Sequence, residues 1–403
     1  MHRFPRLALW LGPLTLLGLL SGCSLLGRRT AEVTLPERPL LAPDPRLALA
    51  GHAPLEVTRR DDGTVLVGGE PFFPLGFYYL PWAQGGTAAQ RSLDLQQFER
   101  GGFNLMATEP ANDQDVSTYA QFLDQAQEHG IFVLSYGLSL HTVSQIAHHP
   151  AVLGFKIADD SNAQLTPAQV LARNLSTKRL SPDKLTYISL SVGEGRPETG
   201  YFGMADMVGN QRYPVGNDDI GVTYHVMRSA VQSAQARRSV PVANLQTFSW
   251  GRGKPAPTAA ELRNMSYQAL MAGVKGVIYY AYRAREVNLG REPRLWAGAQ
   301  SVAREIAQVA PALLGGERSE LSDGRSGRPV IVRFSGAGGS YLMALNNSRT
   351  RRQKVDLSLG TPPELWLPLD RQSGGLALSG AQVSGELAPL QVAVYHLDRP
   401  ESP

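Results

Sequence analysis

The stretch 152–160, VLGFKIADD, shows how the central part of the chain is built. We read residues 152–159 as a β-strand. Strand alternation places Phe155 and Ile157 on one face, and Lys156, Ala158 and Asp160 on the other. The bulky apolar pair suits packing against helices. We therefore expect the second face to look into the interior of the fold and to bring Asp160 to the end of the strand.

Strand-like and helix-like segments alternate on both sides of this stretch. The other predicted strands are 73–79, 104–109, 131–136, 186–192, 207–213, 241–248 and 276–282. The predicted helices lie near 91–101, 117–129, 142–148, 167–177, 222–237, 258–273 and 295–313. The Gly-rich connection 193–206 is less clearly helical. Eight strands separated mostly by helices indicate parallel crossovers, and their number predicts a closed (β/α)8 (TIM) barrel.

An open, doubly wound α/β sheet is the alternative architecture for such alternation. It would normally carry a Gly-rich phosphate-binding loop after its first strand. The residues in that place, 76–82, read GFYYLPW and do not fit a G-x-G-x-x-G pattern. The closed barrel is therefore preferred.

The barrel is expected to span 54–315, with a hairpin in front and a second domain behind. Strand-forming residues at 55–58 and 64–67 flank the turn Asp61-Asp62-Gly63, which is a hairpin signal. Past residue 316, short alternating strands without helices between them predict a small antiparallel β-sandwich over 316–403. The clearest of these strands are 330–334, 341–346, 355–359 and 392–397.

The first 53 residues read as a targeting segment followed by a tether. Arg3 and Arg6 precede an apolar run over 7–20, which is too short for a good transmembrane helix. The residues LSGC at 20–23 resemble the lipobox of bacterial lipoproteins. We therefore predict a signal peptide over 1–22, lipidation of Cys23 and a Pro-rich tether over 23–53. The protein would then be anchored to a membrane of the bacterial cell envelope, facing outside the cytoplasm; which membrane is left open.

Composition excludes several classes of function. The chain has 403 residues, of which 43% are hydrophobic and 18% charged, so it can bury a large core. The formal net charge of +4 is small and dispersed, which argues against nucleic acid as a partner. A single cysteine cannot form an internal disulfide or a Cys-based zinc site. His141, His148 and His149 are close in sequence, but we favour a loop role for them and predict neither a metal nor another cofactor.

In a barrel, function gathers at the carboxyl ends of the strands, here called the mouth. Alternation places Asp160 there, with Glu109 at the end of the second strand and either Asn210 or Gln211 at the end of the sixth. The mouth is rich in aromatic residues, whose faces stack on sugar rings while amides and carboxylates bond to hydroxyl groups. The candidate carbohydrate-binding residues are Tyr79, Trp82, Asn210, Tyr213, Gln246, Trp250, Tyr280 and Tyr282.

Five segments in the same order resemble (β/α)8 glycoside hydrolases. They are GEPFFPLG at 69–76, GGFN at 101–104, HPAVLGFKIADD at 149–160, LQTFSW at 245–250 and GVKGVIYY at 273–280. The resemblance spans roughly residues 64–315. It implies a carbohydrate-binding barrel whose fourth strand ends in an acid, and that position is Asp160 here.

The sequence departs from this family at the residues that matter most for catalysis. The family's glutamate is Asp160, its following proline is Ser161, and the seventh strand carries Gln246 where many related barrels have a glutamate nucleophile. Hydrolysis needs two carboxyl groups, about 5–5.5 Å apart for retention or about 6.5–9.5 Å apart for inversion. Asp160 and Glu109 are the strand-end pair that we predict, while Asp206 lies on the connection before the sixth strand.

Three functions remain open at this point. The first is a membrane-anchored glycoside hydrolase-like protein that acts on an oligo- or polysaccharide, with Asp160 as general acid and with Glu109 or a water-positioning group as its partner. The second is a carbohydrate-binding lipoprotein without catalysis, which Gln246 and the exchange of Glu for Asp favour. The third is a structural envelope protein. Asp160 could also be a structural carboxylate paired with Lys156, and Glu109 could cap the loop before Pro110. The oligomeric state is left open.

Overall fold

The computed structural model describes residues 55–80, 86–110, 115–192, 197–285 and 287–398. The predicted signal peptide, the lipidated Cys23 and the tether lie outside these residues, and so does Trp82. None of the helices in the described ranges is long and apolar enough to cross a membrane.

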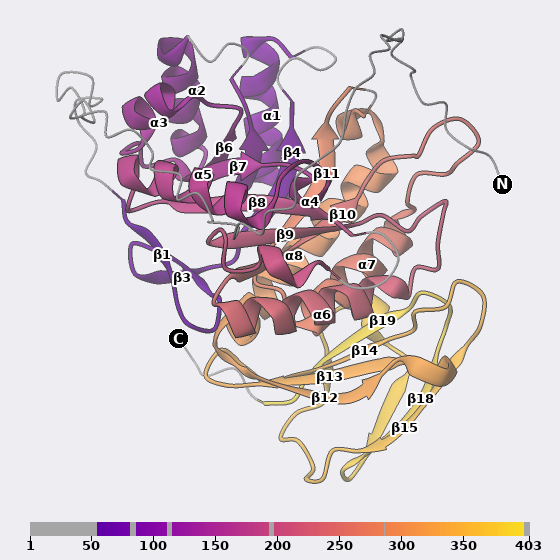
Figure 1. Cartoon of the computed structure of the whole chain (residues 1–403). Helices are drawn as coiled ribbons and strands as arrows, with labels where there is room; N and C mark the ends of the chain where they lie inside the picture. Colours follow the sequence, from indigo (N-terminus) through magenta and orange to yellow (C-terminus); the bar gives the residue numbers. More distant parts are fainter. Residues whose placement is uncertain (1–54, 81–85, 111–114, 193–196, 286, 399–403) are drawn as a thin grey trace, which may run out of the picture. The chain divides into compact units, whose positions relative to one another are not determined.

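Eight parallel strands form a closed barrel, which confirms the predicted fold class (Figure 1). The strands are β4 (Leu75–Tyr79), β5 (Leu105–Thr108), β6 (Phe132–Tyr136), β7 (Val152–Ala158), β8 (Leu185–Ser191), β9 (Met207–Arg212), β10 (Val240–Gln246) and β11 (Val277–Arg283). They follow one another around the ring in chain order, and β11 closes it by pairing with β4.

An α-helix follows each barrel strand except β8 along the chain. The helices are α1 (Ala88–Gly101), α2 (Val116–Glu128), α3 (Leu140–Ile146), α4 (Ser161–Gln164), α5 (Pro167–Leu180), α6 (Val222–Arg237), α7 (Ala259–Ala272) and α8 (Pro293–Gly315). Their ends follow local rules. Thr166 and Thr258 begin α5 and α7 with capping boxes, in which side chains satisfy the free N–H groups of the first turn. Gly273 ends α7 with a φ of 102°, a conformation that costs a residue with a Cβ atom energy.

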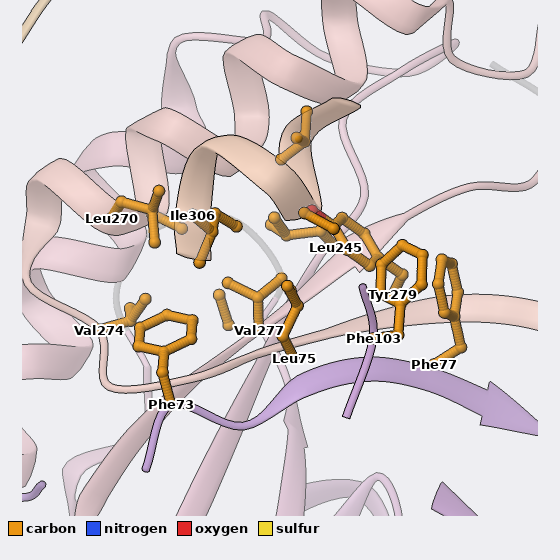
Figure 2. Packing of buried hydrophobic residues seen from close by; sticks show 14 of the residues in the cluster. Phe73, Leu75, Phe77, Phe103, Leu245, Leu270, Val274, Val277, Tyr279 and Ile306 are labelled. Atoms are coloured by element: carbon orange, nitrogen blue, oxygen red, sulfur yellow. The ribbon is translucent and has the colours of Figure 1, made fainter. Parts of the chain in front are cut away.

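The barrel wall separates two apolar layers. Outward-facing side chains of the strands pack against the helices in the larger cluster, and Figure 2 shows this packing for strand residues such as Leu75, Leu245 and Val277 beside Leu270 of α7 and Ile306 of α8. Inward-facing side chains of the strands form a smaller apolar cluster inside the barrel. Burial of each large apolar side chain contributes about 1.5–3 kcal/mol, so both layers stabilise the ring on which the mouth depends.

A three-stranded antiparallel sheet lies against the amino ends of the barrel strands. It comprises β1 (Val57–Arg59), β2 (Val65–Val67) and β3 (Glu70–Phe72), and it contains the predicted hairpin. The backbone N–H of Val57 donates to the carbonyl of Asp183 over 2.9 Å. The fully buried ammonium of Lys184 donates to the carbonyl of Leu55 over 2.6 Å. These bonds join the hairpin to the loop that precedes β8.

The chain after α8 forms the β-domain, residues 317–398, which is the predicted antiparallel sandwich. One sheet has β12 (Glu317–Asp323), β13 (Val330–Ser335), β14 (Tyr341–Leu345), β19 (Val392–His396) and β16 (Leu367–Pro368), and the other has β15 (Gln353–Ser358), β18 (Gln382–Leu387) and β17 (Leu376–Ser379). Residues of both sheets, such as Leu342 and Val383, share one core. The strands missed by the sequence analysis, β12 and β16–β18, are short or largely exposed.

Buried polar bonds join the barrel helices to the β-domain. Arg263 of α7 pairs with Glu305 of α8 over 2.9 Å and donates to the carbonyl of Val392 over 2.9 Å. It also reaches the carboxylate of Asp370 over 3.3 Å. One guanidinium group therefore links two barrel helices to a strand and a turn of the β-domain.

Candidate functional site

An irregularity in β7 decides which acidic residue enters the barrel. The pairing of β7 with β8 shifts register between Lys156 and Ala158. As a result Ala158 packs outside the wall with Val170 of α5, and the prediction that it faces inward was wrong. Asp159 takes the inward place instead. A β-bulge of this kind re-aims every side chain that follows it.

A cavity of about 490 Å³ opens at the mouth. Its lining combines three tyrosines with two acidic and two basic side chains. The lining residues are Tyr78, Leu80, Ala107, Glu109, Tyr136, Lys156, Asp159, Tyr280 and Arg285. The cavity is large enough for a small organic ligand, and it lies where the sequence analysis expected the function to reside.

Lys156 lies at the centre of the electrostatics of this cavity. Its ammonium is 2.9 Å from Oδ1 of Asp159 and lies over the rings of Tyr78 and Tyr136, at 4.4 and 4.3 Å from their centroids. Burial lowers the pKa of Lys156, and nearby carboxylates, with Asp159 first among them, partly counteract this. The ion pair suggested between Lys156 and Asp160 is thus made with Asp159.

Asp159 is held in its ionised form. Burial by itself would raise the pKa of this carboxyl group, but the charge of Lys156 and the hydroxyl of Ser189 outweigh burial, so the pKa lies below its ordinary value. The hydroxyl of Ser189 donates to Oδ1 of Asp159 in a short hydrogen bond. Asp159 therefore carries a negative charge at neutral pH.

Asp160, the predicted acid, follows Asp159 directly and is half-buried, but it is not among the residues that line the cavity. Its Oδ1 accepts a hydrogen bond from Nε2 of Gln211 over 2.7 Å. Burial, followed by the negative charge of Asp159, raises the pKa of Asp160, while the bond from Gln211 acts in the opposite direction. Two adjacent carboxyl groups thus have pKa values shifted in opposite directions, which is typical of acid–base sites.

Glu109 follows directly after β5 and lines the cavity. The register aligns Thr108 of β5 with Ser135 of β6, and Tyr136 of β6 with Lys156 of β7. Glu109 is therefore level with Lys156, two strands away around the wall. The pKa of the Tyr136 hydroxyl is raised mainly by burial, and the negative charges of Glu109 and Asp160 raise it further. The structure brings the two predicted acids to the same mouth.

Four aromatic side chains form a wall beside the cavity. The ring of Tyr280 lies 5.6 Å from that of Phe248, which lies 5.1 Å from Trp250, and Tyr213 contacts all three. Nε1 of Trp250 donates to the carbonyl of Tyr213 over 3.2 Å. The side chain of Trp250 is 46% exposed, so it offers an open aromatic surface. Tyr213, Trp250 and Tyr280 thus occupy the predicted region.

Other predicted binding residues lie outside the barrel wall. The hydroxyl of Tyr79 donates to Asp94 of α1 over 2.9 Å in the packed layer between strands and helices. Tyr282 packs in the same layer against Phe98, because the pairing of β11 with β4 shifts register between Tyr279 and Arg283. The expectation that Tyr282 shares the inward face of Tyr280 is therefore corrected.

The two amide side chains predicted at the end of β9 lie on opposite faces of the strand. Gly209 faces the interior, since a Cβ atom there would meet the hydroxyl of Tyr187. Asn210 consequently faces outward, where its amide donates to the carbonyls of Val208 and Val242. Gln211 is the β9 amide that reaches the mouth.

Gln246, at the end of β10, is fully buried and bonded at both ends of its amide. Its Oε1 accepts from the backbone N–H of Val215 over 2.8 Å, and its Nε2 donates to the carbonyls of Val215 and Phe248. The side chain holds the loop after β9 against the end of β10. It is fully buried and does not line the cavity, so the prediction that it binds a ligand is corrected.

Within the described ranges, no cluster of His, Cys, Asp and Glu could hold a metal ion. Nε2 of His149 lies 3.1 Å from Asp124, and its Nδ1 accepts the backbone N–H of Ala151 over 3.1 Å. These bonds give His149 a role in the loop before β7.

Asp159 and Ser189 were not predicted as parts of the site. Asp159 belongs to the stretch 152–160, but it faces inward only because the pairing of β7 with β8 shifts register. Gln211 was an open alternative to Asn210. Lys156 was predicted to face inward, which the structure confirms.

Comparison with solved structures identifies proteins that share this fold. No protein-family model and no curated protein matches the chain. A glycoside hydrolase family 5 protein from Bacteroides vulgatus has a TM-score of 0.61 at 14% identity, with 85% of this chain and 93% of that chain covered. Amy13B from Eubacterium rectale has a TM-score of 0.57 at 8% identity, over 86% and 97% of the two chains.

An α-amylase from Geobacillus thermoleovorans, solved with acarbose, has a TM-score of 0.54 at 10% identity, with 85% of this chain and the whole of that chain covered. The chain has the fold of (β/α)8 glycoside hydrolases. Because all three identities are low, the likeness establishes the fold, while function has to be argued from the site.

Proposed function

We propose that this protein is a carbohydrate-active, glycoside hydrolase-like protein that binds an oligo- or polysaccharide at the barrel mouth and cleaves it with Asp160 as general acid. The observation that carries the proposal is the pair of adjacent carboxyl groups with opposite pKa shifts beside a cavity with an aromatic wall. The glycoside hydrolase fold supports carbohydrate as the ligand.

Asp160 suits the role of proton donor. Its raised pKa increases the protonated fraction, and the neighbouring charge of Asp159 opposes loss of the proton. In the proposed reaction Asp160 gives its proton to the glycosidic oxygen as the bond from the anomeric carbon to that oxygen breaks. A residue with an ordinary carboxyl pKa would be almost fully ionised at neutral pH.

Glu109 suits the role of general base. Neighbouring strands lie about 4.8 Å apart, so β5 and β7 are roughly 10 Å apart along the wall. From backbones at such a separation, side chains that reach toward each other can bring their carboxyl groups to the distance of about 6.5–9.5 Å that inversion requires. Glu109 would take a proton from that water while its oxygen attacks the anomeric carbon. Gln246 cannot form a covalent glycosyl intermediate from β10, which also favours direct attack by water.

The aromatic wall suits the apolar faces of sugar rings. The exposed ring of Trp250 lies beyond the cavity, and Tyr280 lines the cavity itself. A chain of sugar units laid along this wall would stack on both residues. We therefore favour a ligand of more than one sugar unit.

Membrane attachment through Cys23 forms part of the proposal. It is supported by the positive segment before an apolar run and by the residues LSGC at 20–23. A tether of about 30 residues would allow the barrel to work at some distance from the membrane. Metabolic labelling with a palmitate analogue should mark the wild type and leave Cys23→Ser unlabelled.

The direct test uses product release from defined oligosaccharides. Wild type, Asp160→Asn and Asp61→Asn are incubated with maltohexaose, cellohexaose, laminarihexaose and chitohexaose, and products are separated by chromatography. Asp61 lies in the exposed turn between β1 and β2, far along the chain from the mouth, and serves as the matched control. We expect release by wild type and the control and at least about 1,000-fold slower release by Asp160→Asn. Equal rates in Asp160→Asn and the wild type would refute the role of Asp160.

A carbohydrate-binding protein without catalysis is the second candidate. The structure favours it in one respect, because the amide of Gln246 is committed to backbone groups where related barrels are expected to carry a carboxylate. This function predicts calorimetric binding of one of the four hexasaccharides with no product after long incubation. Absence of both binding and release would reject both candidates.

A further inference from the structure

Ser189 lies in the middle of β8, faces the barrel interior and is fully buried. Its hydroxyl group makes three hydrogen bonds at once. It donates to Oδ1 of Asp159, and it accepts from the backbone N–H of Asp160 over 3.2 Å and from Nε2 of Gln211 over 3.1 Å. A hydroxyl has one donor and two acceptor positions, so all its capacity is used.

These bonds determine how the amide of Gln211 is turned. Because the only hydrogen of the Ser189 hydroxyl points to Asp159, the Ser189 oxygen can only accept from Gln211. The NH2 group of Gln211 must therefore face Ser189, and its second hydrogen then points to Oδ1 of Asp160 at 2.7 Å. With the amide reversed, two acceptors would face each other at both contacts.

Ser189 also holds the backbone at Asp160. This residue has φ 41° and ψ 46°, in the left-handed region. Such a conformation costs a residue other than glycine about 1 kcal/mol or more and persists only where the surroundings enforce it. The bond from the Asp160 N–H to Ser189 is one such restraint. Backbone and side chain of Asp160 are thus both tied to the same hydroxyl.

We propose that Ser189 is the positioning residue of the site, and that its hydroxyl orients the carboxyl group of Asp160 through Gln211 and through the backbone of Asp160. This inference rests on the proposed function for its catalytic meaning, but the orientation itself can be measured without a substrate. Ser189 is fully buried and its hydroxyl is fully bonded, so it acts on the reaction only through its neighbours.

Several groups set the titration of Asp160 besides Gln211. The charged and titratable groups that face it are Lys156 on β7, Asp159 directly after β7, Tyr136 on β6, Tyr213 directly after β9 and Tyr280 on β11. Among these groups, only Asp159 is bonded directly to Ser189. Loss of the Gln211 bond removes a donor that favours the ionised carboxyl, so the Asp160 titration should move to higher pH.

The test follows the Asp160 carboxyl by 13C NMR in protein labelled at aspartate, with the signal assigned by its loss in Asp160→Asn. Four variants are compared: Ser189→Ala, Ser189→Thr, Gln211→Leu and Ser191→Ala. Ser191 is the matched control, because it lies on the same strand with the same inward parity but is exposed. Thermal unfolding of each variant establishes that it is folded.

We expect the Asp160 midpoint to rise by about 0.5–1 pH unit in Ser189→Ala and in Gln211→Leu, and to return toward wild type in Ser189→Thr. Ser191→Ala should leave it unchanged. An unchanged midpoint in Ser189→Ala or in Gln211→Leu, with the variant folded, would overturn the inference. If Asp160→Asn proves as active as wild type, the proposed function fails, while the NMR result still decides whether Ser189 orients Asp160.

Discussion

The ammonium of Lys156 lies 2.9 Å from Oδ1 of Asp159 while its positive charge lies over the rings of Tyr78 and Tyr136. Three strands of the barrel therefore contribute to the solvation of one buried cation. This arrangement replaces the water that Lys156 lost on burial, and it leaves Asp160 without a direct cationic partner among the ion pairs of the described ranges. Asp160 can then keep a raised pKa beside two charged neighbours.

Replacing Lys156 by methionine should strongly destabilise the barrel. The substitution keeps the apolar contacts of the side chain but leaves the Asp159 carboxylate, which is 33% exposed, without its cation, at a cost of about 1–3 kcal/mol. Urea unfolding followed by circular dichroism measures the loss. The double variant Lys156→Met/Asp159→Asn should recover part of it, since no unpaired charge remains. A single variant within about 0.5 kcal/mol of wild type would show that the pair is not buried as described.

Replacing Asp159 by asparagine should lower the pKa of Asp160. The negative charge of Asp159 is the largest cause after burial that raises this pKa, and asparagine keeps the shape without the charge. The 13C titration of Asp160 should move to lower pH, opposite in sign to the change expected for Ser189→Ala. Asp124→Asn, which removes a carboxylate paired with His149, is the control and should have no effect.

The contrast between barrel and site shows what the amino-acid pattern can predict. Each barrel strand carries enough apolar side chains to be recognised locally, and the crossover helices supply their own caps, such as Thr166 and Thr258. Eight such units, without a Gly-rich phosphate loop after the first strand, favour a ring over an open sheet. That Asp160 reaches the mouth follows from its place at the end of the fourth unit, so it could be predicted.

The inward and outward faces near the strand ends could not be predicted as reliably. Alternation of side chains assumes regular pairing, but β7 and β11 both shift register close to the mouth. These shifts turn Asp159 inward and Tyr282 outward. They arise from fitting neighbouring strands together, which is a property of the closed sheet and not of either strand. The network around Ser189 likewise joins residues from three strands, and no spacing in the chain reveals it.

Replacing Trp250 by alanine should weaken saccharide binding without loss of the fold. The side chain is 46% exposed, so its removal should change the free energy of unfolding by less than about 1 kcal/mol. Loss of a stacking surface should lower the affinity for a bound hexasaccharide about tenfold by calorimetry. Trp366→Ala, in the β-domain, is the control and should bind as wild type does. Equal affinity in Trp250→Ala and wild type would place the sugar elsewhere.

Removing Arg263 should loosen the β-domain from the barrel helices. Arg263→Met leaves the buried Glu305 without its cation and the carbonyl of Val392 without its donor, at a cost of about 3–5 kcal/mol. Hydrogen exchange should then speed up in α7, α8 and β19 together. Arg294→Met, an exposed change on α8, serves for comparison and should leave exchange unaltered. Faster exchange in β19 alone would contradict the inference that Arg263 stabilises the barrel helices and the β-domain together.

The buried Lys184 should make stability increase with pH in the alkaline range. Burial lowers its pKa from 10.5 to about 8 in the folded protein. Between these two pH values the unfolded chain binds more protons than the folded one, so the free energy of unfolding rises with pH. The gain is lost when the pH is lowered to about 8 and below. The predicted gain between pH 7 and 9.5 is about 2 kcal/mol. Other groups also titrate in this range, so the quantity to measure is the difference between wild type and Lys184→Met at each pH. That difference should shift in favour of wild type as the pH rises, and a difference independent of pH would mean that Lys184 keeps its ordinary pKa.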